Sequence, residues 1–401
     1  MLPNLEEHKG PVARPALRPG RSARSMPGRG TIPRLGRVSP ESVAVGTPLS
    51  SAAPSRRALW AAVDRLVDST DDVSALRVNG LHLFAARRWR EHGRAVPAEL
   101  ERAERLALLV TLIVPHVLRQ VRSACEGTIV LHKGPEIAAR YPDPALRSYI
   151  DLDVLVRDAG ETQQALLGAW FEEVGDPVRY EATPHLRPLH MPGLPLLVEV
   201  HSSPNWPAWL GPPPVQELLD AAVPSSLGID GVLTLAPHHH ALAVAAHSWA
   251  HGPLARVRDL VDVAAMAEGL ERAELLSTAR RWGLERLWRT TIGTAGAVLF
   301  GDSNPYADSK PWALRTWARN LPAVRERTVL ERHVALLLAG FSALGVGRGA
   351  REMVAQAGRD LRPVGDEAWG TKLWRTRVAL RNARVRKSVH EEELARGARR
   401  R

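Results

Sequence analysis

The spacing of apolar residues predicts helices at both ends of the chain. Leu59, Val63 and Leu66 recur at the three- and four-residue spacing of an amphipathic helix. A longer apolar helix is predicted between Pro97 and Ala124, where Pro115 should kink or break it. After residue 237 the helical spacing returns, near residues 238–251, 254–268, 271–281, 284–299, 311–319 and 324–343.

The pattern changes at residue 128, where short apolar runs replace the helical spacing. Residues 128–132 predict a buried strand, which a short helix ending at Arg140 should follow. Further along, residues 150–156 predict a strand and residues 161–174 a helix. Two antiparallel strands are then predicted at residues 186–191 and 196–201. Strands and helices that alternate over about 75 residues indicate one compact unit.

The fold class predicted by this pattern is α+β, with a small mixed β-sheet core flanked by N- and C-terminal helical regions. Residues 1–55 are rich in Pro, Gly, Ser and Arg and poor in large apolar side chains, which predicts disorder. The predicted parts are a basic tail at 1–55, a helical region at 56–127, a core at 128–228, a helical domain at 229–345 and a basic, mostly helical tail at 346–401.

Charge is distributed unevenly along the 401 residues. Lys and Arg number 54 against 43 Asp and Glu, a formal net charge of +11. Residues 1–55 contain 8 basic and 3 acidic side chains, and residues 371–401 contain 11 and 3, which leaves 35 basic and 37 acidic side chains between them. A nucleic-acid-binding domain normally has its basic surface within the folded part. We therefore do not expect the core to bind nucleic acid.

Cysteine content and hydropathy limit the cellular locations that we expect for the protein. The single cysteine, Cys125, excludes an internal disulfide and a cysteine-based zinc site, and a cytoplasmic location is expected. The most apolar run, from Leu106 to Leu118, looks too short to span a bilayer, so no membrane partner is expected. The N-terminus lacks the apolar stretch of a signal peptide.

Two carboxylates are predicted to share one face of a strand. Side chains alternate along a strand, so Asp151 and Asp153 should project together while Ile150, Leu152 and Val154 point into the core. Two adjacent like charges are unfavourable unless a cation lies between them. The ordinary alternative for an isolated Asp-x-Asp is a strand end that enters solvent.

A third carboxylate strengthens the metal hypothesis. Glu199 and His201 share a face of the predicted strand at 196–201. If the two strands are neighbours, Asp151, Asp153 and Glu199 form one acidic cluster. Three carboxylates suit a hard cation such as Mg²⁺, and two such ions can activate an attacking oxygen and stabilise a leaving phosphate.

The turn after the first predicted strand has features of a phosphate-binding turn. Gly134 allows the backbone to approach a ligand closely, and Lys133 could add a positive charge. Arg147 could reach an anionic substrate from the loop before Asp151. The ordinary alternatives are a plain strand–helix turn and an exposed loop arginine.

Four segments together resemble a known family. They are Leu131-His-Lys-Gly134, Tyr141-Pro-Asp-Pro-Ala-Leu-Arg147, Asp151-Leu-Asp-Val-Leu-Val156 and Val198-Glu-Val-His201. Their order resembles the bacterial uncharacterised nucleotidyltransferase family of the DNA polymerase beta-like superfamily. The similarity continues through residues 237–266, where the matching residues are His247, His251, Arg258 and Asp262.

The resemblance implies transfer of a nucleoside monophosphate from an NTP, with ATP as the expected donor, to an unidentified small-molecule, peptide or protein acceptor. Asp151 and Asp153 match the superfamily's metal-binding pair and Glu199 its third carboxylate, which implies two Mg²⁺ ions, with Mn²⁺ as a substitute. Lys133-Gly134 stands where most of the superfamily has Gly-Ser. Ser148 stands where the family usually has Pro, and is a candidate phosphate contact.

Two other functions stay open at this stage, and three histidines are assigned to the site. A metal-dependent glycosyltransferase also uses Asp-x-Asp, although it needs a longer α/β domain ahead of that motif. A catalytically inactive binding or scaffold protein is the second alternative. His201 is a candidate substrate contact, and its alternative is a buried core histidine. His247 and His251 are spaced four residues apart, but they lack the glutamate of zinc proteases, so we expect them to be structural or to lie at the rim of the nucleotide site.

Overall fold

The structure is a computed structural model that describes residues 55–175, 186–250, 252–305, 324–363 and 367–398. These residues all belong to one compact unit, Ser51–Arg401. The predicted disorder of residues 1–55, the predicted helix at 311–319 and His251 lie outside the described residues. The domain boundaries set from the sequence stay a prediction.

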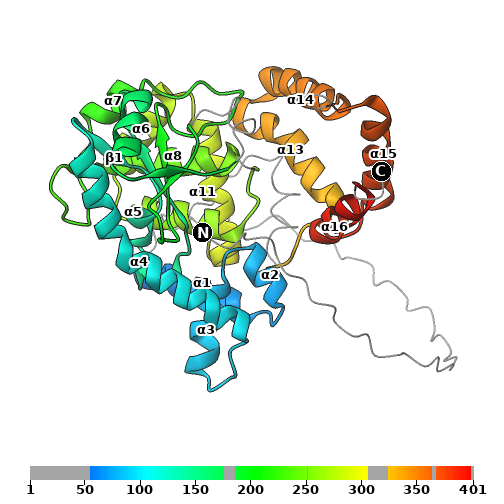
Figure 1. Cartoon of the computed structure of the whole chain (residues 1–401). Helices are drawn as coiled ribbons and strands as arrows, with labels where there is room; N and C mark the ends of the chain where they lie inside the picture. Colours follow the sequence, from blue (N-terminus) through cyan, green and yellow to red (C-terminus); the bar gives the residue numbers. More distant parts are fainter. Residues whose placement is uncertain (1–54, 176–185, 251, 306–323, 364–366, 399–401) are drawn as a thin grey trace, which may run out of the picture. The chain divides into compact units, whose positions relative to one another are not determined.

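Four helices precede the sheet (Figure 1): α1 (Arg56–Asp68), α2 (Val73–Val78), α3 (His82–Glu91) and α4 (Ala98–Ala124). Each of the first two helices begins after a capping residue. The Ser55 side chain accepts a hydrogen bond from the backbone N–H of Ala58, and the Asp72 side chain accepts one from the backbone N–H of Ala75. Of the two outcomes expected at Pro115, the break is wrong, because α4 runs through the proline without interruption, and the kink stays a prediction. The apolar face of α4 is anchored in the core on both sides of the proline, by Val110, Val114, Val117, Leu118 and Val121.

The length of α4 corrects a second expectation. The helix has 27 residues and is, by length and composition, apolar enough to cross a membrane, whereas the sequence suggested a run too short for that. About a third of its most apolar window (33%) is buried inside the protein, and Leu112 is exposed. A core helix of a globular unit has the same composition, so α4 alone does not define a membrane segment.

The centre of the chain forms a seven-stranded mixed sheet, as predicted. The strands are β1 (Ile129–Leu131), β2 (Asp151–Leu155), β3 (Glu172–Glu173), β4 (Leu189–His190), β5 (Leu197–His201), β6 (Val223–Pro224) and β7 (Val232–Thr234). Their order is β3-β4-β5-β2-β1-β7-β6. The helical segments between them are α5 (Pro135–Ala138), η1 (Pro144–Leu146), α6 (Ala159–Gly168) and α7 (Val215–Asp220).

Pairing within the sheet confirms the central strand prediction. β2 and β5 are parallel neighbours, and β4 pairs antiparallel with β5. The sequence missed β6 and β7, which have two and three residues, although β7 pairs parallel with β1 at the centre. It also made the helix after β2 too long, because α6 ends at Gly168 and β3 follows.

The sheet has an apolar face and a polar face. Leu131, Leu152 and Val198 belong to the apolar face, which packs against α4 and α6. The residues that alternate with these point to the opposite face, where Asp153 and Glu199 are direct partners in the register. One expectation fails here: Ile150 is 53% exposed because β2 begins only at the next residue.

Helices follow the sheet to the end of the described chain. They are α8 (Pro237–Ala250), α9 (Val257–Ala267), α10 (Arg272–Arg281), α11 (Glu285–Phe300), η3 (Gly301–Ser303), α13 (Val329–Leu344), α14 (Val346–Leu361), α15 (Trp369–Arg381) and α16 (Lys387–Ala398). A second apolar cluster joins α8, α9 and α11 to α1 and α3 (Figure 1). Thr290 of α11 donates a hydrogen bond of 3.3 Å to the carbonyl of Ser342 in α13, which fixes the C-terminal helices on this cluster.

Candidate functional site

A cavity of about 830 Å³ opens beside the polar face of the sheet. All seven residues that the sequence assigned to metal and phosphate binding line it: Lys133, Gly134, Arg147, Ser148, Asp151, Asp153 and Glu199. The volume lies within the range of small-molecule and cofactor sites. The fold therefore brings one set of sequence-predicted residues into a single site.

The turn between β1 and α5 depends on a glycine. Gly134 has a φ of +61°, a conformation that other residues rarely adopt. A β-carbon at this position would lie 3.2 Å from the carbonyl oxygen of Asp151, so the turn also needs the space that glycine leaves. α5 is a single turn, Pro135–Ala138, and ends two residues before the predicted end at Arg140.

Buried polar contacts from α8, from β7 and from the segment after β6 hold this turn in place. His240 of α8 lies 2.8 Å from the carbonyl oxygen of His132, and burial lowers the pKa of its imidazole to about 4. Thr234 of β7 donates a 3.0 Å bond to the carbonyl of Leu131, and Ser226 donates a 3.1 Å bond to the buried carboxylate of Glu136. His240, in the run of three histidines, therefore supports the site without lining it.

Asp153 is the most enclosed carboxylate of the site, with 1% of its surface exposed. Its Oδ1 atom lies 2.7 Å from Nζ of Lys133 and 3.1 Å from Nε2 of His201. Burial by itself would raise the pKa of Asp153, but the Lys133 ammonium and the His201 contact hold it well below its ordinary value of 3.8. Asp153 is thus ionised and already faces a cation.

Asp151 and Glu199 complete the acidic cluster at the opening. Burial, followed by the charges of Asp153 and Glu199, raises the pKa of Asp151 above 3.8. His201 joins the other two carboxylates, since its Nε2 lies 3.1 Å from Asp153 and 3.6 Å from Oε2 of Glu199. The predicted cluster of three carboxylates therefore forms, and its members repel one another.

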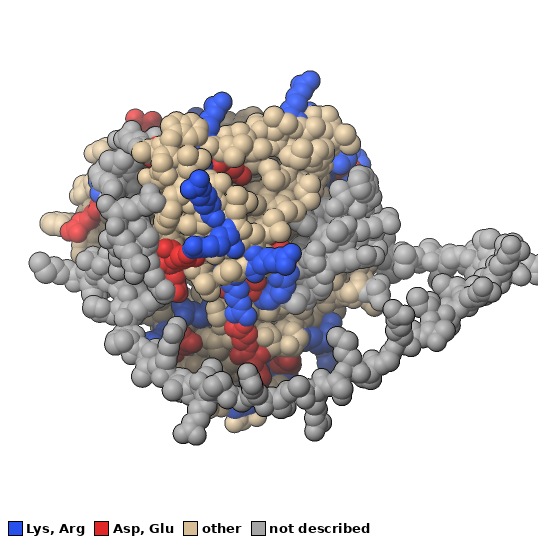
Figure 2. All heavy atoms as spheres, turned by 90° about the vertical axis from the view of Figure 1, so that its right-hand side faces the viewer, with Lys and Arg blue, Asp and Glu red and all other residues tan. Residues whose placement is uncertain are grey.

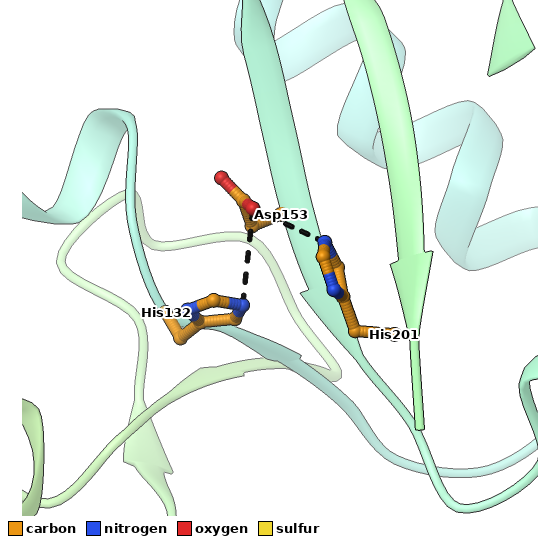
Figure 3. Close-up of side chains that lie close together, drawn as sticks. All are labelled: His132, Asp153 and His201. Atoms are coloured by element: carbon orange, nitrogen blue, oxygen red, sulfur yellow. Dashed lines mark ion pairs between the residues drawn. The ribbon is translucent and has the colours of Figure 1, made fainter. Parts of the chain in front are cut away.

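His132 is a site residue that the sequence reasoning missed. Three side chains converge from neighbouring strands: His132 from the end of β1, Asp153 from β2 and His201 from β5. Their ligand atoms lie within 4.8 Å of one another (Figure 3). All three are buried. The available signal was alternation: His132 lies two residues after Val130, so it continues the strand face opposite Leu131.

Arg147 makes a buried ion pair. Its Nε and Nη2 atoms lie 2.9 Å from the two carboxylate oxygens of Asp262 in α9, and Tyr141 donates a 2.6 Å bond to the same carboxylate. Only 7% of Arg147 is exposed, so the exposed-loop alternative is wrong. The role of Arg147 as a phosphate ligand stays a prediction, because its Nε and Nη2 atoms donate to Asp262.

The remaining predicted contacts lie at different depths. Ser148 lines the cavity, and its carbonyl accepts a 3.0 Å bond from Arg258. Nε2 of His247 lies 3.4 Å from Nζ of Lys133, so His247 reaches the Lys133-Gly134 turn. His201 is buried beneath the carboxylates, which makes it a partner of Asp153 and Glu199.

Comparison with known proteins gives one match. A family model described as uncharacterised nucleotidyltransferase matches residues 67–299, more than half of the chain. The chain belongs to this nucleotidyltransferase family. No curated protein and no solved structure matches the chain.

The matched region contains the whole sheet and every residue of the predicted site, but it stops before α13. The cavity extends beyond the matched region, because Arg325, Arg327, Arg332 and Lys387 also line its walls. The glycosyltransferase alternative required an α/β domain ahead of Asp151. Among described residues, that region holds four helices, one strand and two short helical turns, so this requirement is not met.

Proposed function

We propose that the protein transfers a nucleoside monophosphate from an NTP, with ATP as the expected donor, to an acceptor and releases pyrophosphate. The observation that carries this proposal is the acidic cluster of Asp151, Asp153 and Glu199 beside the Lys133-Gly134 turn, within the region matched by the nucleotidyltransferase family. As in the resemblance above, the polymerase beta-like superfamily supplies the expected reaction.

The donor atoms of this cluster fit Mg²⁺, and Mn²⁺ as its substitute. Carboxylate oxygens are the preferred ligands of hard cations. Burial, and then the charges of Asp153 and Glu199, raise the pKa of Asp151, so a bound cation would favour its ionised form. Asp151, Asp153 and Glu199 would hold two ions. When bound, the ions would polarise the phosphates and neutralise the charge that develops during transfer.

The chain's own residues would position the reactants and move one proton. Lys133, at 2.7 Å from Asp153 and on the cavity wall, would donate to the phosphates once metal binds to that carboxylate. Glu199, half-buried on the same wall, would accept the proton of the acceptor hydroxyl.

The acceptor oxygen would then form a bond to the α-phosphorus. The bond from that phosphorus to the bridging oxygen breaks, and pyrophosphate leaves with the electron pair. Most of the rate enhancement would come from positioning and from charge neutralisation.

Labelled ATP tests the proposed reaction. The protein is incubated with Mg²⁺, an extract of its source cells and ATP labelled either at the α-phosphate or at the γ-phosphate. We expect the α-label to appear on an acceptor and the γ-label in pyrophosphate, with neither product from Asp153→Asn. Transfer of the γ-label to the acceptor would show phosphoryl transfer and contradict the proposal. Absence of any product, together with absence of ATP binding, would favour the scaffold alternative.

A further inference from the structure

Three arginines form a second charged region of the same cavity. Arg256 and Arg258 belong to the segment that enters α9, and Arg327 belongs to the segment before α13. We call these three residues the arginine wall. Arg327 donates a hydrogen bond to the carbonyl of Leu254, two residues before Arg256, so the two segments are in direct contact.

The arginine wall differs from the other cations of the cavity in its partners. Each of the other cations named here has a carboxylate partner. The pairs are Lys133 with Asp153, Arg147 with Asp262, Arg325 with Glu331, and both Lys387 and Arg332 with Glu391. Within the described part of the chain, no carboxylate lies within ion-pair distance of Arg256, Arg258 or Arg327. Arg258 and Arg327 donate to the backbone carbonyls of Ser148 and Leu254. Neutral carbonyls do not replace an ion pair.

Burial makes this lack of partners significant. Arg258 is half-buried, and its Nε atom is enclosed without a hydrogen-bond partner among described residues. Burial lowers the pKa of Arg327 to about 10, well below that of an ordinary guanidinium. A partly desolvated cation without an anion is unfavourable. The free energy of this arrangement would fall if an anion entered the cavity.

Carboxylates act on the wall at longer range, without an ion pair. Asp259, whose pKa burial raises, and Asp262 act on Arg258, and Glu331 and Asp259 act on Arg327. His82 lines the same cavity, and burial together with Arg77 and Arg258 lowers its pKa to about 4. On the face shown in Figure 2, Lys and Arg side chains near the centre lie beside Asp and Glu side chains, and others stand alone among uncharged residues.

We propose that the arginine wall is a binding subsite for an oxyanion of the phosphate class. The planar guanidinium fork matches the geometry of phosphate, and all three arginines line a cavity large enough for a ligand. The anion has two possible sources, the terminal phosphates of the NTP or a phosphate on the acceptor. Because Arg327 lies outside the family match at residues 67–299, a segment beyond that match builds part of this subsite.

Calorimetric titration with inorganic phosphate tests the proposal without divalent ions and without turnover. We expect the dissociation constant to rise at least about 10-fold in Arg258→Gln and in Arg327→Gln. Arg256→Gln provides a variant that keeps the fold, since Arg256 is exposed. The control is Arg280→Gln, an exposed arginine paired with Glu285 outside the cavity, which should bind phosphate as the wild type does. Equal phosphate binding by the wild type and all three wall variants would overturn the proposal, as would no binding by the wild type.

A second titration identifies the source of the anion. Phosphate is titrated into protein saturated with metal-free ATP. Loss of phosphate binding assigns the wall to the NTP, and persistence of binding assigns it to the acceptor. The subsite does not depend on the proposed nucleotidyl transfer, because Asp153→Asn should lose transfer and retain phosphate binding. Failure of one proposal is therefore distinguishable from failure of the other.

Discussion

The two charged walls of the cavity differ in how their charges are compensated. At the sheet, Asp153 faces Lys133 and His201, so its negative charge has partners within the protein. At the arginine wall, Arg258 and Arg327 have carbonyl partners, and no described carboxylate lies within ion-pair distance of them. In our proposals, the first wall holds a cation near phosphates and the second receives an anion.

This difference indicates which wall contributes to the stability of the fold and which contributes to ligand binding. A compensated charge contributes to folding and gives the site a fixed geometry. An uncompensated, partly buried charge disfavours folding and gains its partner only from a ligand. Substitutions at compensated pairs should therefore reduce stability, whereas substitutions at the arginine wall should reduce binding.

The largest expected effect is at Asp262. In Asp262→Asn the buried guanidinium of Arg147 loses its ionised partner, and we expect the free energy of unfolding to fall by about 3–5 kcal/mol. Urea denaturation measures this change. The control is Asp71→Asn, which removes the exposed pair with Arg94 and should change stability by less than about 1 kcal/mol. Equal effects of the two substitutions would show that the Arg147 pair is not a structural clamp.

The same pair predicts a dependence of stability on pH. Burial would raise the pKa of Asp262, but Arg147 outweighs burial and holds it below 3.8. A carboxyl with a lowered pKa stabilises the fold above its unfolded-state value, and this contribution is lost as the pH falls below 3.8. The wild type should therefore lose stability more steeply below pH 3.8 than Asp262→Asn does, measured by denaturation at a series of pH values. Parallel curves would contradict this.

The next effect concerns the carboxylate wall, which is the cluster of Asp151, Asp153 and Glu199. Asp153→Asn removes the central charged ligand, and we expect the affinity for Mn²⁺ to fall by more than about 100-fold. Electron paramagnetic resonance of free Mn²⁺ measures this binding without nucleotide. Glu126→Gln, at an exposed position outside the cavity, should bind Mn²⁺ as the wild type does. Retained affinity in Asp153→Asn would exclude this carboxylate as a metal ligand.

A smaller effect is expected where the arginine wall packs on a glycine. Gly80 has a φ of +70°, and a β-carbon there would lie 2.9 Å from two side-chain carbons of Arg258. Gly93 has nearly the same φ, +67°, with open space around it. Both alanine variants should lose about 1–2 kcal/mol of stability from the left-handed backbone, but only Gly80→Ala should also weaken phosphate binding. Equal phosphate affinities in the two variants would show that Arg258 is not held against Gly80.

The smallest expected effect on stability is at Arg327. In the absence of phosphate, Arg327→Gln should be within about 1 kcal/mol of the wild type, because the lost charge had no carboxylate partner. Phosphate should raise the Tm of the wild type and not that of the variant. A large loss of stability without phosphate would mean that the charge is compensated within the protein.

The sequence predicted the carboxylate wall better than the arginine wall, for a physical reason. Alternation was enough to bring Asp151 and Asp153 to one face, and the parallel register of β2 and β5 adds Glu199 to it. His132 follows the same rule: it stands in the predicted strand at 128–132, but its side chain was not assigned to a face.

The arginine wall could not be predicted in this way. Arg258 and Arg327 are 69 positions apart, and only the packing of the C-terminal helices brings their segments together. The fate of Arg147 was likewise hidden, because its partner Asp262 lies more than 100 residues away on a helix whose sequence shows only amphipathic spacing. Periodicity predicts faces of local elements and carries no information on which distant faces meet.

Binding of ATP with and without Mg²⁺ tests the central claim most directly. In calorimetric titrations we expect the wild type to bind ATP at least about 10-fold more tightly with Mg²⁺ than with EDTA, and Asp153→Asn to lose this difference. A wild type whose affinity for ATP does not depend on the divalent ion, or which does not bind ATP, would contradict the assignment of the carboxylate wall to metal-dependent nucleotidyl transfer.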